Sequence, residues 1–127
     1  MPTLFSHDDL ITALRDCFDT SLQCNIVDLG EVTSAKLELD IDAPGSSVSP
    51  RYRAEIKLML PMRDEAAEGQ LITQIANRLA GIWEISESKI EVEDEIWTPD
   101  RITPEGRRIL GLDRPPRGPE LIQIKLP

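Results

Sequence analysis

The sequence predicts an α+β fold, and two observations lead to this prediction. Some runs repeat apolar residues at helical spacing, and others alternate apolar with polar residues as a half-buried strand does. Their order along the chain is helix, strand, strand, helix, strand, helix. This order predicts a small mixed or antiparallel sheet of three to four strands, two main helices on one face of it, and a short C-terminal helix.

The first helix is predicted to begin at Ser6, whose side chain can cap free backbone N–H groups. A stripe of apolar residues follows at helical spacing: Leu10, Ile11, Leu14, Cys17 and Phe18. We expect this helix to end near Asp19 or Thr20. Because Cys17 belongs to the stripe, we interpret it as a small core residue.

The first two strands are predicted at Val32–Ile41 and Arg51–Leu60, where apolar and polar residues alternate. The loop Asp42–Pro50 is rich in Gly, Pro and Ser, so the two strands should form an antiparallel hairpin. The outward faces carry opposite charges suited to cross-strand pairing: Glu38 and Asp40 on one strand, Arg51 and Arg53 on the other.

A second amphipathic helix is predicted around Leu71–Leu79, and Gly81 is a natural stop for it. The third strand is predicted at Ile90–Ile96, with Ile90, Val92 and Ile96 on its inner face. Outward glutamates on this strand fit a solvated face better than a cation site.

A short last helix is predicted from Thr103 as its N-cap to Gly111 as its stop. We therefore assign residues 1–112 to one domain and residues 113–127 to a Pro-rich linker and tail. The tail contains Leu121–Leu126, apolar enough for a last strand. Such a strand could add to the edge of its own sheet or to the sheet of a neighbouring chain. In the second case the protein would form a homodimer.

The bulk composition narrows the class of function. The 127 residues carry a net charge of −9 and have a pI of about 4.6, which argues against nucleic-acid and anionic membrane partners. No apolar run reaches the length of a membrane span, and Met1–His7 does not look like a secretory signal. With only two cysteines, the chain is expected to be a cytoplasmic protein with reduced thiols.

Recognisable catalytic motifs are absent from the sequence. There is no phosphate loop, CxxC, HExxH or nucleophile elbow, and the single histidine, His7, opens the first helix at an exposed position. We therefore expect no enzymatic activity. Cys24 lies outside the helices and has two readings, a packed thiol or a metal ligand.

The stretch Cys24-Asn25-Ile26-Val27-Asp28-Leu29-Gly30 joins the first helix to the first strand. Asp28 lies between apolar neighbours and must find hydrogen-bond donors if it is buried. Gly30 frees the backbone for a turn. The stretch is therefore predicted to be a partly buried corner.

Two segments carry a family resemblance. The run from Asp19 to Gly30, ending in Asn-Ile-Val-Asp-Leu-Gly, and the run Trp97–Gly111, beginning Trp-Thr-Pro-Asp-Arg-Ile, resemble the iron–sulfur cluster assembly domain family, the PaaD/SufT-like metal–sulfur cluster biosynthetic proteins. The resemblance spans about Leu10–Leu112. It implies a shared motif pocket formed by Asn25, Asp28, Gly30, Trp97, Asp100 and Arg101. For Asp28 and Trp97 we favour a structural interpretation, in which Asp28 caps a turn and the indole of Trp97 seals the core.

The resemblance implies an accessory or scaffold protein in iron–sulfur cluster or metal-cofactor assembly, which contacts assembly or recipient proteins and meets iron or a cluster transiently. Family members typically carry Pro-Glu where this chain has Thr20-Ser21. They also carry a cysteine after the second strand, where this chain has Leu60–Glu65 with Met62. Because that cysteine is missing, Cys24 is the candidate metal ligand of this chain. The alternative is a non-catalytic interaction module that kept the fold and lost the metal-handling cysteine.

Overall fold

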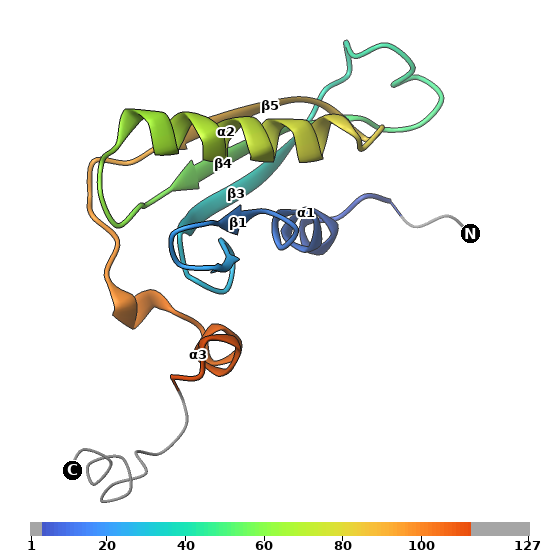
Figure 1. Ribbon diagram of the computed structural model, residues 1–127. Coiled ribbons are helices and arrows are strands. Elements are labelled where there is room, and N and C mark those ends of the chain that lie inside the picture. The colour runs from blue at the N-terminus through green and yellow to red at the C-terminus, as the bar shows by residue number, and fades with distance from the viewer. Residues whose placement is uncertain (1–3, 113–127) are drawn as a thin grey trace, which may run out of the picture.

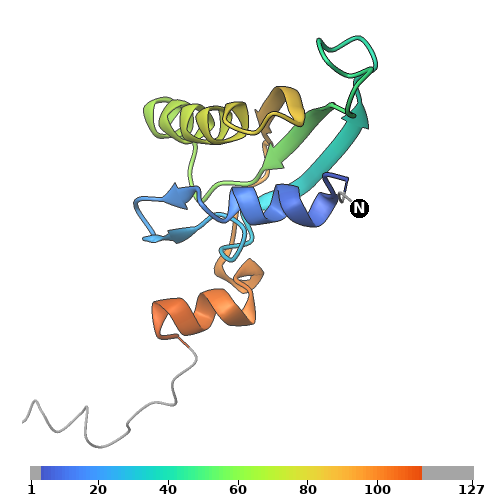
Figure 2. The ribbon, with the colours of Figure 1, turned by 90° about the vertical axis from the view of Figure 1, so that its right-hand side faces the viewer.

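The structure is a computed structural model and describes residues 4–112 (Figures 1 and 2). Its architecture is α+β, as the sequence predicts. The elements in chain order are α1 (His7–Leu14), β1 (Phe18–Asp19), β2 (Cys24–Asn25), β3 (Val32–Leu39), β4 (Tyr52–Leu58), α2 (Glu65–Ala80), β5 (Ile85–Val92), the 3-10 helix η1 (Pro99–Arg101) and α3 (Pro104–Leu110).

The main sheet has three strands in the order β3-β4-β5. Strands β3 and β4 form the predicted antiparallel hairpin, with Ala35 opposite Ile56. Strands β4 and β5 are parallel, with Ile56 opposite Ile90. A parallel pair needs a crossover connection, and α2 supplies it. The sheet is therefore mixed.

The core lies between the sheet and the two longer helices. Alternate residues of β4 point into it, and they share one buried cluster with side chains of α1 and α2: Ala54, Ile56 and Leu58 with Leu10, Leu14, Ile75 and Leu79. Both helices therefore cover the same face of the sheet (Figures 1 and 2). Burying each large aliphatic side chain contributes about 1.5–3 kcal/mol.

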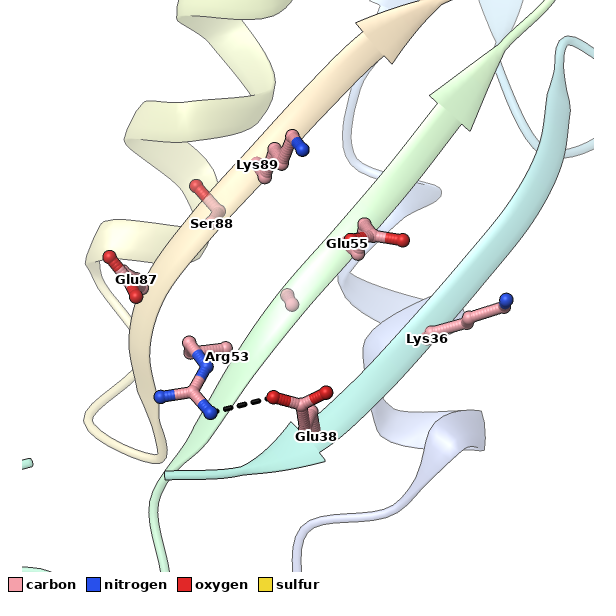
Figure 3. Close-up of a pocket in the computed structure, with 8 residues that line it drawn as sticks. Lys36, Glu38, Arg53, Glu55, Glu87, Ser88 and Lys89 are labelled. Atoms are coloured by element: carbon pink, nitrogen blue, oxygen red, sulfur yellow. Dashed lines mark hydrogen bonds and ion pairs between the residues drawn. The ribbon is translucent and has the colours of Figure 1, made fainter. Parts of the chain in front are cut away.

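The opposite face of the sheet is open and charged (Figure 3). Charges alternate across the strands in two rows: Glu38, Arg53 and Glu87, then Lys36, Glu55 and Lys89. Arg53 lies 2.6 Å from a carboxylate oxygen of Glu38 and 3.1 Å from one of Asp40, which confirms the predicted cross-strand pairing for this arginine.

Arg51 does not form the expected cross-strand ion pair. Its guanidinium lies 4.7 Å from the ring centroid of Trp83 and donates to the carbonyls of Trp83 and Pro44 at 2.8 and 2.9 Å. Arg51 therefore ties the loop between β3 and β4 to the connection before β5.

Helix α1 is shorter than the apolar stripe predicts. The Ser6 cap is confirmed, as a capping box with Asp9, but the helix ends at Leu14. Cys17 is buried in the core as expected, whereas Phe18 begins β1 and is 48% exposed. The cause is tertiary: the side-chain amide of Gln74 on α2 accepts from the Phe18 N–H at 2.8 Å and donates to its carbonyl at 3.1 Å, so the backbone here is extended.

Strand β5 begins and ends earlier than the predicted Ile90–Ile96. It covers Ile85–Val92, and its inward position opposite Ala54 is Ser88, a hydroxyl residue that interrupts the apolar pattern. Ile96 lies beyond the strand and is 48% exposed, so its assignment to the inner face is wrong.

Helices α2 and α3 begin and end at the capping residues of their sequences. Helix α2 is longer than its apolar stripe because Asp64 caps it, accepting from the Ala66 N–H at 3.1 Å, and Gly81 is its C-cap. Thr103 caps α3, and Gly111 ends it with a φ of 76°. The further strand expected at Leu121–Leu126 lies outside the described residues.

Candidate functional site

The first motif segment folds into a tight turn held by its own side chains. Asn25 accepts from the Asp28 N–H at 2.8 Å and donates its amide to an Asp28 carboxylate oxygen at 2.8 Å. Gly30 closes the turn with a φ of 74°. Asp28 is buried, and this pairing supplies the donors that its position between Val27 and Leu29 requires.

The second motif segment locks onto this turn. The Trp97 indole N–H donates to the Leu29 carbonyl at 2.6 Å, and Arg101 Nε donates to the Gly30 carbonyl at 2.7 Å. Thr103 bonds Asp28 twice: its backbone N–H donates to the Asp28 carbonyl at 2.8 Å, and its hydroxyl donates to the carboxylate at 3.0 Å. The structure thus brings the two motif segments into one unit.

Two glycines allow the close approach between the segments. A Cβ on Gly30 would lie 2.2 Å from the Arg101 carbonyl oxygen, and one on Gly106 would lie 2.5 Å from the Asp28 carbonyl oxygen. Both distances are below any van der Waals contact. The glycine at position 106, on α3, is a part of the unit that the motif comparison alone does not single out.

Asp100 takes no part in this contact. It is exposed, and its carboxylate accepts from the Thr98 hydroxyl of the same turn, which lowers its pKa. Of the predicted motif residues, Asn25, Asp28, Gly30, Trp97 and Arg101 are brought together.

Cys24 packs inside the unit. Its side chain is fully buried in a cluster with Leu29, Trp97 and Ile102, and burial raises the pKa of its thiol. A protonated thiol is a poor ligand and nucleophile. Within residues 4–112, moreover, no three Cys, His, Asp or Glu side chains are arranged to hold one metal ion. The described residues therefore do not fit a resident metal centre at Cys24.

Glu31 is a buried acid that the sequence analysis did not single out. Its side chain is fully buried, and no group within residues 4–112 donates a hydrogen bond to either carboxylate oxygen. Burial, followed by the neighbouring carboxylate of Asp19, raises its pKa to about 9. The signal available in the sequence was a glutamate directly after Gly30, at the entrance of a strand.

An open pocket lies beside this unit, and we call it the hairpin groove. Its walls come from the β1–β2 hairpin, the segment after β4 and the first half of α2, and its volume is about 290 Å³. Phe18, Leu22, Leu60, Met62 and Leu71 supply much of its apolar lining, and Asp19 lies beside them. The two segments where this chain departs from the family pattern, Thr20-Ser21 and the stretch around Met62, meet in this groove.

No protein-family model matches the chain, and no curated protein sequence matches it significantly. Among solved structures, it resembles a domain of unknown function, DUF59, from Bacillus anthracis, with a TM-score of 0.64 and 20% identity over 83% of this chain and 91% of that chain. A conserved hypothetical protein from Thermotoga maritima gives a TM-score of 0.56 and 24% identity over 87% of this chain and 99% of that chain. The chain therefore has the fold of this DUF59 domain.

A third solved structure, Rv1466 from Mycobacterium tuberculosis, is 27% identical over 85% of this chain and 86% of that chain, with a TM-score of 0.46. That protein is described as associated with Fe–S complex assembly and repair. Within residues 4–112, none of the helices is both long and apolar enough to cross a membrane.

Proposed function

We propose that this protein is an accessory factor in iron–sulfur cluster or metal-cofactor assembly, of the PaaD/SufT-like kind, and that it acts through protein contacts rather than by turnover. The observation that supports this proposal most is the locked unit of the two family-like segments. Trp97, Arg101 and Thr103 bond the carbonyls of Leu29, Gly30 and Asp28.

The exposed apolar surface of the site supports a protein partner. The hairpin groove is largely apolar, with Phe18 48% and Met62 66% exposed. Exposed apolar side chains of this kind commonly mark protein contacts. Iron or a cluster would then be cargo that passes between partners in the cytoplasm, with this chain holding the partners.

The proposal is tested by reconstitution under anaerobic conditions. The full chain is incubated with iron, sulfide and a reductant, with and without an apo-acceptor and its assembly scaffold, and cluster transfer is followed by absorbance. We expect faster transfer from scaffold to acceptor when this protein is present. An unchanged transfer rate, together with no capture of any assembly protein, would overturn the proposal.

The second candidate function is an interaction module that kept the fold and lost metal handling. It is favoured by the buried, protonated Cys24 and by the methionine in the groove where family members carry a cysteine. A Cys24→Ser variant separates the candidates. A direct role in handling the cluster predicts that the variant loses the iron that the wild-type protein binds. The interaction module predicts that neither protein binds iron and that both bind the partner equally well.

A further inference from the structure

The hairpin groove presents an apolar surface bordered by acids. Phe18, Leu60 and Met62 contribute apolar lining, and Asp19, Asp64 and Glu68 contribute carboxylates. Arg63 neutralises Glu68 at 2.7 Å, while no lysine or arginine within residues 4–112 is among the lining side chains. The groove therefore fits a segment that offers aliphatic side chains together with a cation.

The chain itself carries such a segment outside the described residues. The sequence from Leu121 reads Leu-Ile-Gln-Ile-Lys-Leu. In an extended conformation, Ile122, Ile124 and Leu126 share one face, and Gln123 and Lys125 lie on the other with Leu121. One strand-like segment thus supplies an apolar face and a lysine.

The described part of the chain ends close to the groove. Leu110 of α3 packs against the same buried cluster as Leu22, which lines the groove, and α3 lies beside β2 (Figure 2). The nine residues from Leu112 to Leu121 can span up to about 30 Å. A short tether of this kind gives an effective concentration on the order of millimolar, so even a weak contact would be populated.

We propose that Leu121–Leu126 folds back and occupies the hairpin groove of its own chain. Ile122 and Ile124 contact Phe18, Leu60 and Met62 in the groove. Lys125 leaves from the other face of the segment, and its long side chain bends over the segment's edge to the exposed carboxylate of Asp64. The groove is then covered in the isolated protein, and a partner has to displace the segment. This inference does not depend on the proposed function, because it concerns the isolated chain.

The test places a spin label on the segment in the full-length chain. Gln123→Cys is the labelling site, since Cys17 and Cys24 are both buried. Nuclear magnetic resonance then compares signal intensities with the label active and reduced. We expect Phe18, Leu22 and Met62 to lose more than half of their intensity, whereas Lys36, Glu55 and Lys89, on the opposite sheet face, keep theirs.

A matched pair of second substitutions checks which face of the segment docks. Ile124→Asp should restore the groove signals, and Leu121→Asp, on the other face of the same segment, should leave them broadened. Three results would overturn the proposal: groove signals that the label does not affect, broadening confined to the edges of β3 or β5, or broadening seen only between a labelled chain and a second, isotope-marked copy.

Discussion

Trp97 and Leu29 lie 68 positions apart in the sequence and are joined by a hydrogen bond of 2.6 Å from the indole N–H to the main-chain carbonyl. Both residues are buried, so water cannot replace either partner. The bond fixes the segment after β5 against the turn before β3. It is the central contact of the unit that carries both family-like segments.

Replacement of this indole should destabilise the fold. Trp97→Phe keeps an aromatic ring but leaves the buried Leu29 carbonyl without its donor, so we expect a loss of about 2 kcal/mol in the free energy of unfolding. Urea denaturation measures it. Trp83→Phe is the control, because Trp83 is 48% exposed and the ring that Arg51 covers is retained; equal losses in the two variants would contradict the role of the bond.

A methyl group at either interface glycine should separate the two segments. Gly30→Ala brings a Cβ against the Arg101 carbonyl and also strains a φ of 74°, and Gly106→Ala brings one against the Asp28 carbonyl. We expect each to cost about 2–4 kcal/mol, because main chain rather than a flexible side chain must move. Thermal unfolding of each variant provides the measurement.

The matched control for these variants is Gly69→Ala on α2. Apart from the neighbouring backbone of α2 itself, no atom of the described residues lies within 4 Å of its Cβ position, and the residue is in a helix. Alanine should therefore stabilise the protein by about 0.5–1 kcal/mol. A loss of stability at position 69 equal to that at position 30 would show that the cost is not specific to the interface.

Glu31 should make the protein less stable as pH rises. Its folded pKa of about 9 lies above the ordinary value of 4.5, so across this window the folded state holds a proton that the unfolded state releases. The titration of Glu31 should therefore lower the free energy of unfolding by about 1.4 kcal/mol for each pH unit. The contribution is fully present below pH 4.5 and is lost as pH approaches 9.

Urea denaturation at several pH values between 5 and 8 tests this sign. Glu31→Gln removes the titrating group, so the difference in slope between wild type and variant isolates it from the other acids. Glu55→Gln, on the open charged face, should keep the wild-type slope. A variant at position 31 whose slope matches the wild type would show that Glu31 is ionised in the folded protein.

Both thiols should be unreactive in the folded protein. Cys17 and Cys24 are fully buried, and burial raises both pKa values, that of Cys17 to about 11. A thiol-specific chromogenic reagent should therefore react slowly at neutral pH and rapidly in urea. Fast reaction of one thiol in the native protein, absent in Cys24→Ser, would instead make Cys24 available to metal.

Local signals in the sequence predicted most of the secondary structure. The caps at Ser6 and Thr103 and the alternation through β3 and β4 are properties of neighbouring residues, and the structure agrees with them. Two predictions failed for different reasons. Gln74, which is distant in the sequence, hydrogen-bonds the backbone of Phe18, so the helix ends before the apolar stripe does. On β5, the inward residue Ser88 is polar and hides the alternating pattern of the strand.

The candidate site was predicted only in part. The family resemblance predicted that Asn25, Asp28 and Trp97 share one pocket, but it predicted neither the hydrogen bonds that join their segments nor the exclusion of Asp100 from the contact. The burial of Glu31 and the hairpin groove depend on β1, β2 and α2 meeting in space, which no local pattern encodes.

The sequence by itself determined the α+β class, the order of the main elements and the helix caps, because periodicity and capping act within a few residues of the chain. The tertiary structure decided which hydrogen bonds join the two family-like segments, that Cys24 is buried between them and that burial raises the pKa of Glu31. Burial and desolvation arise only when segments far apart in sequence close around a side chain, so these properties belong to the folded protein.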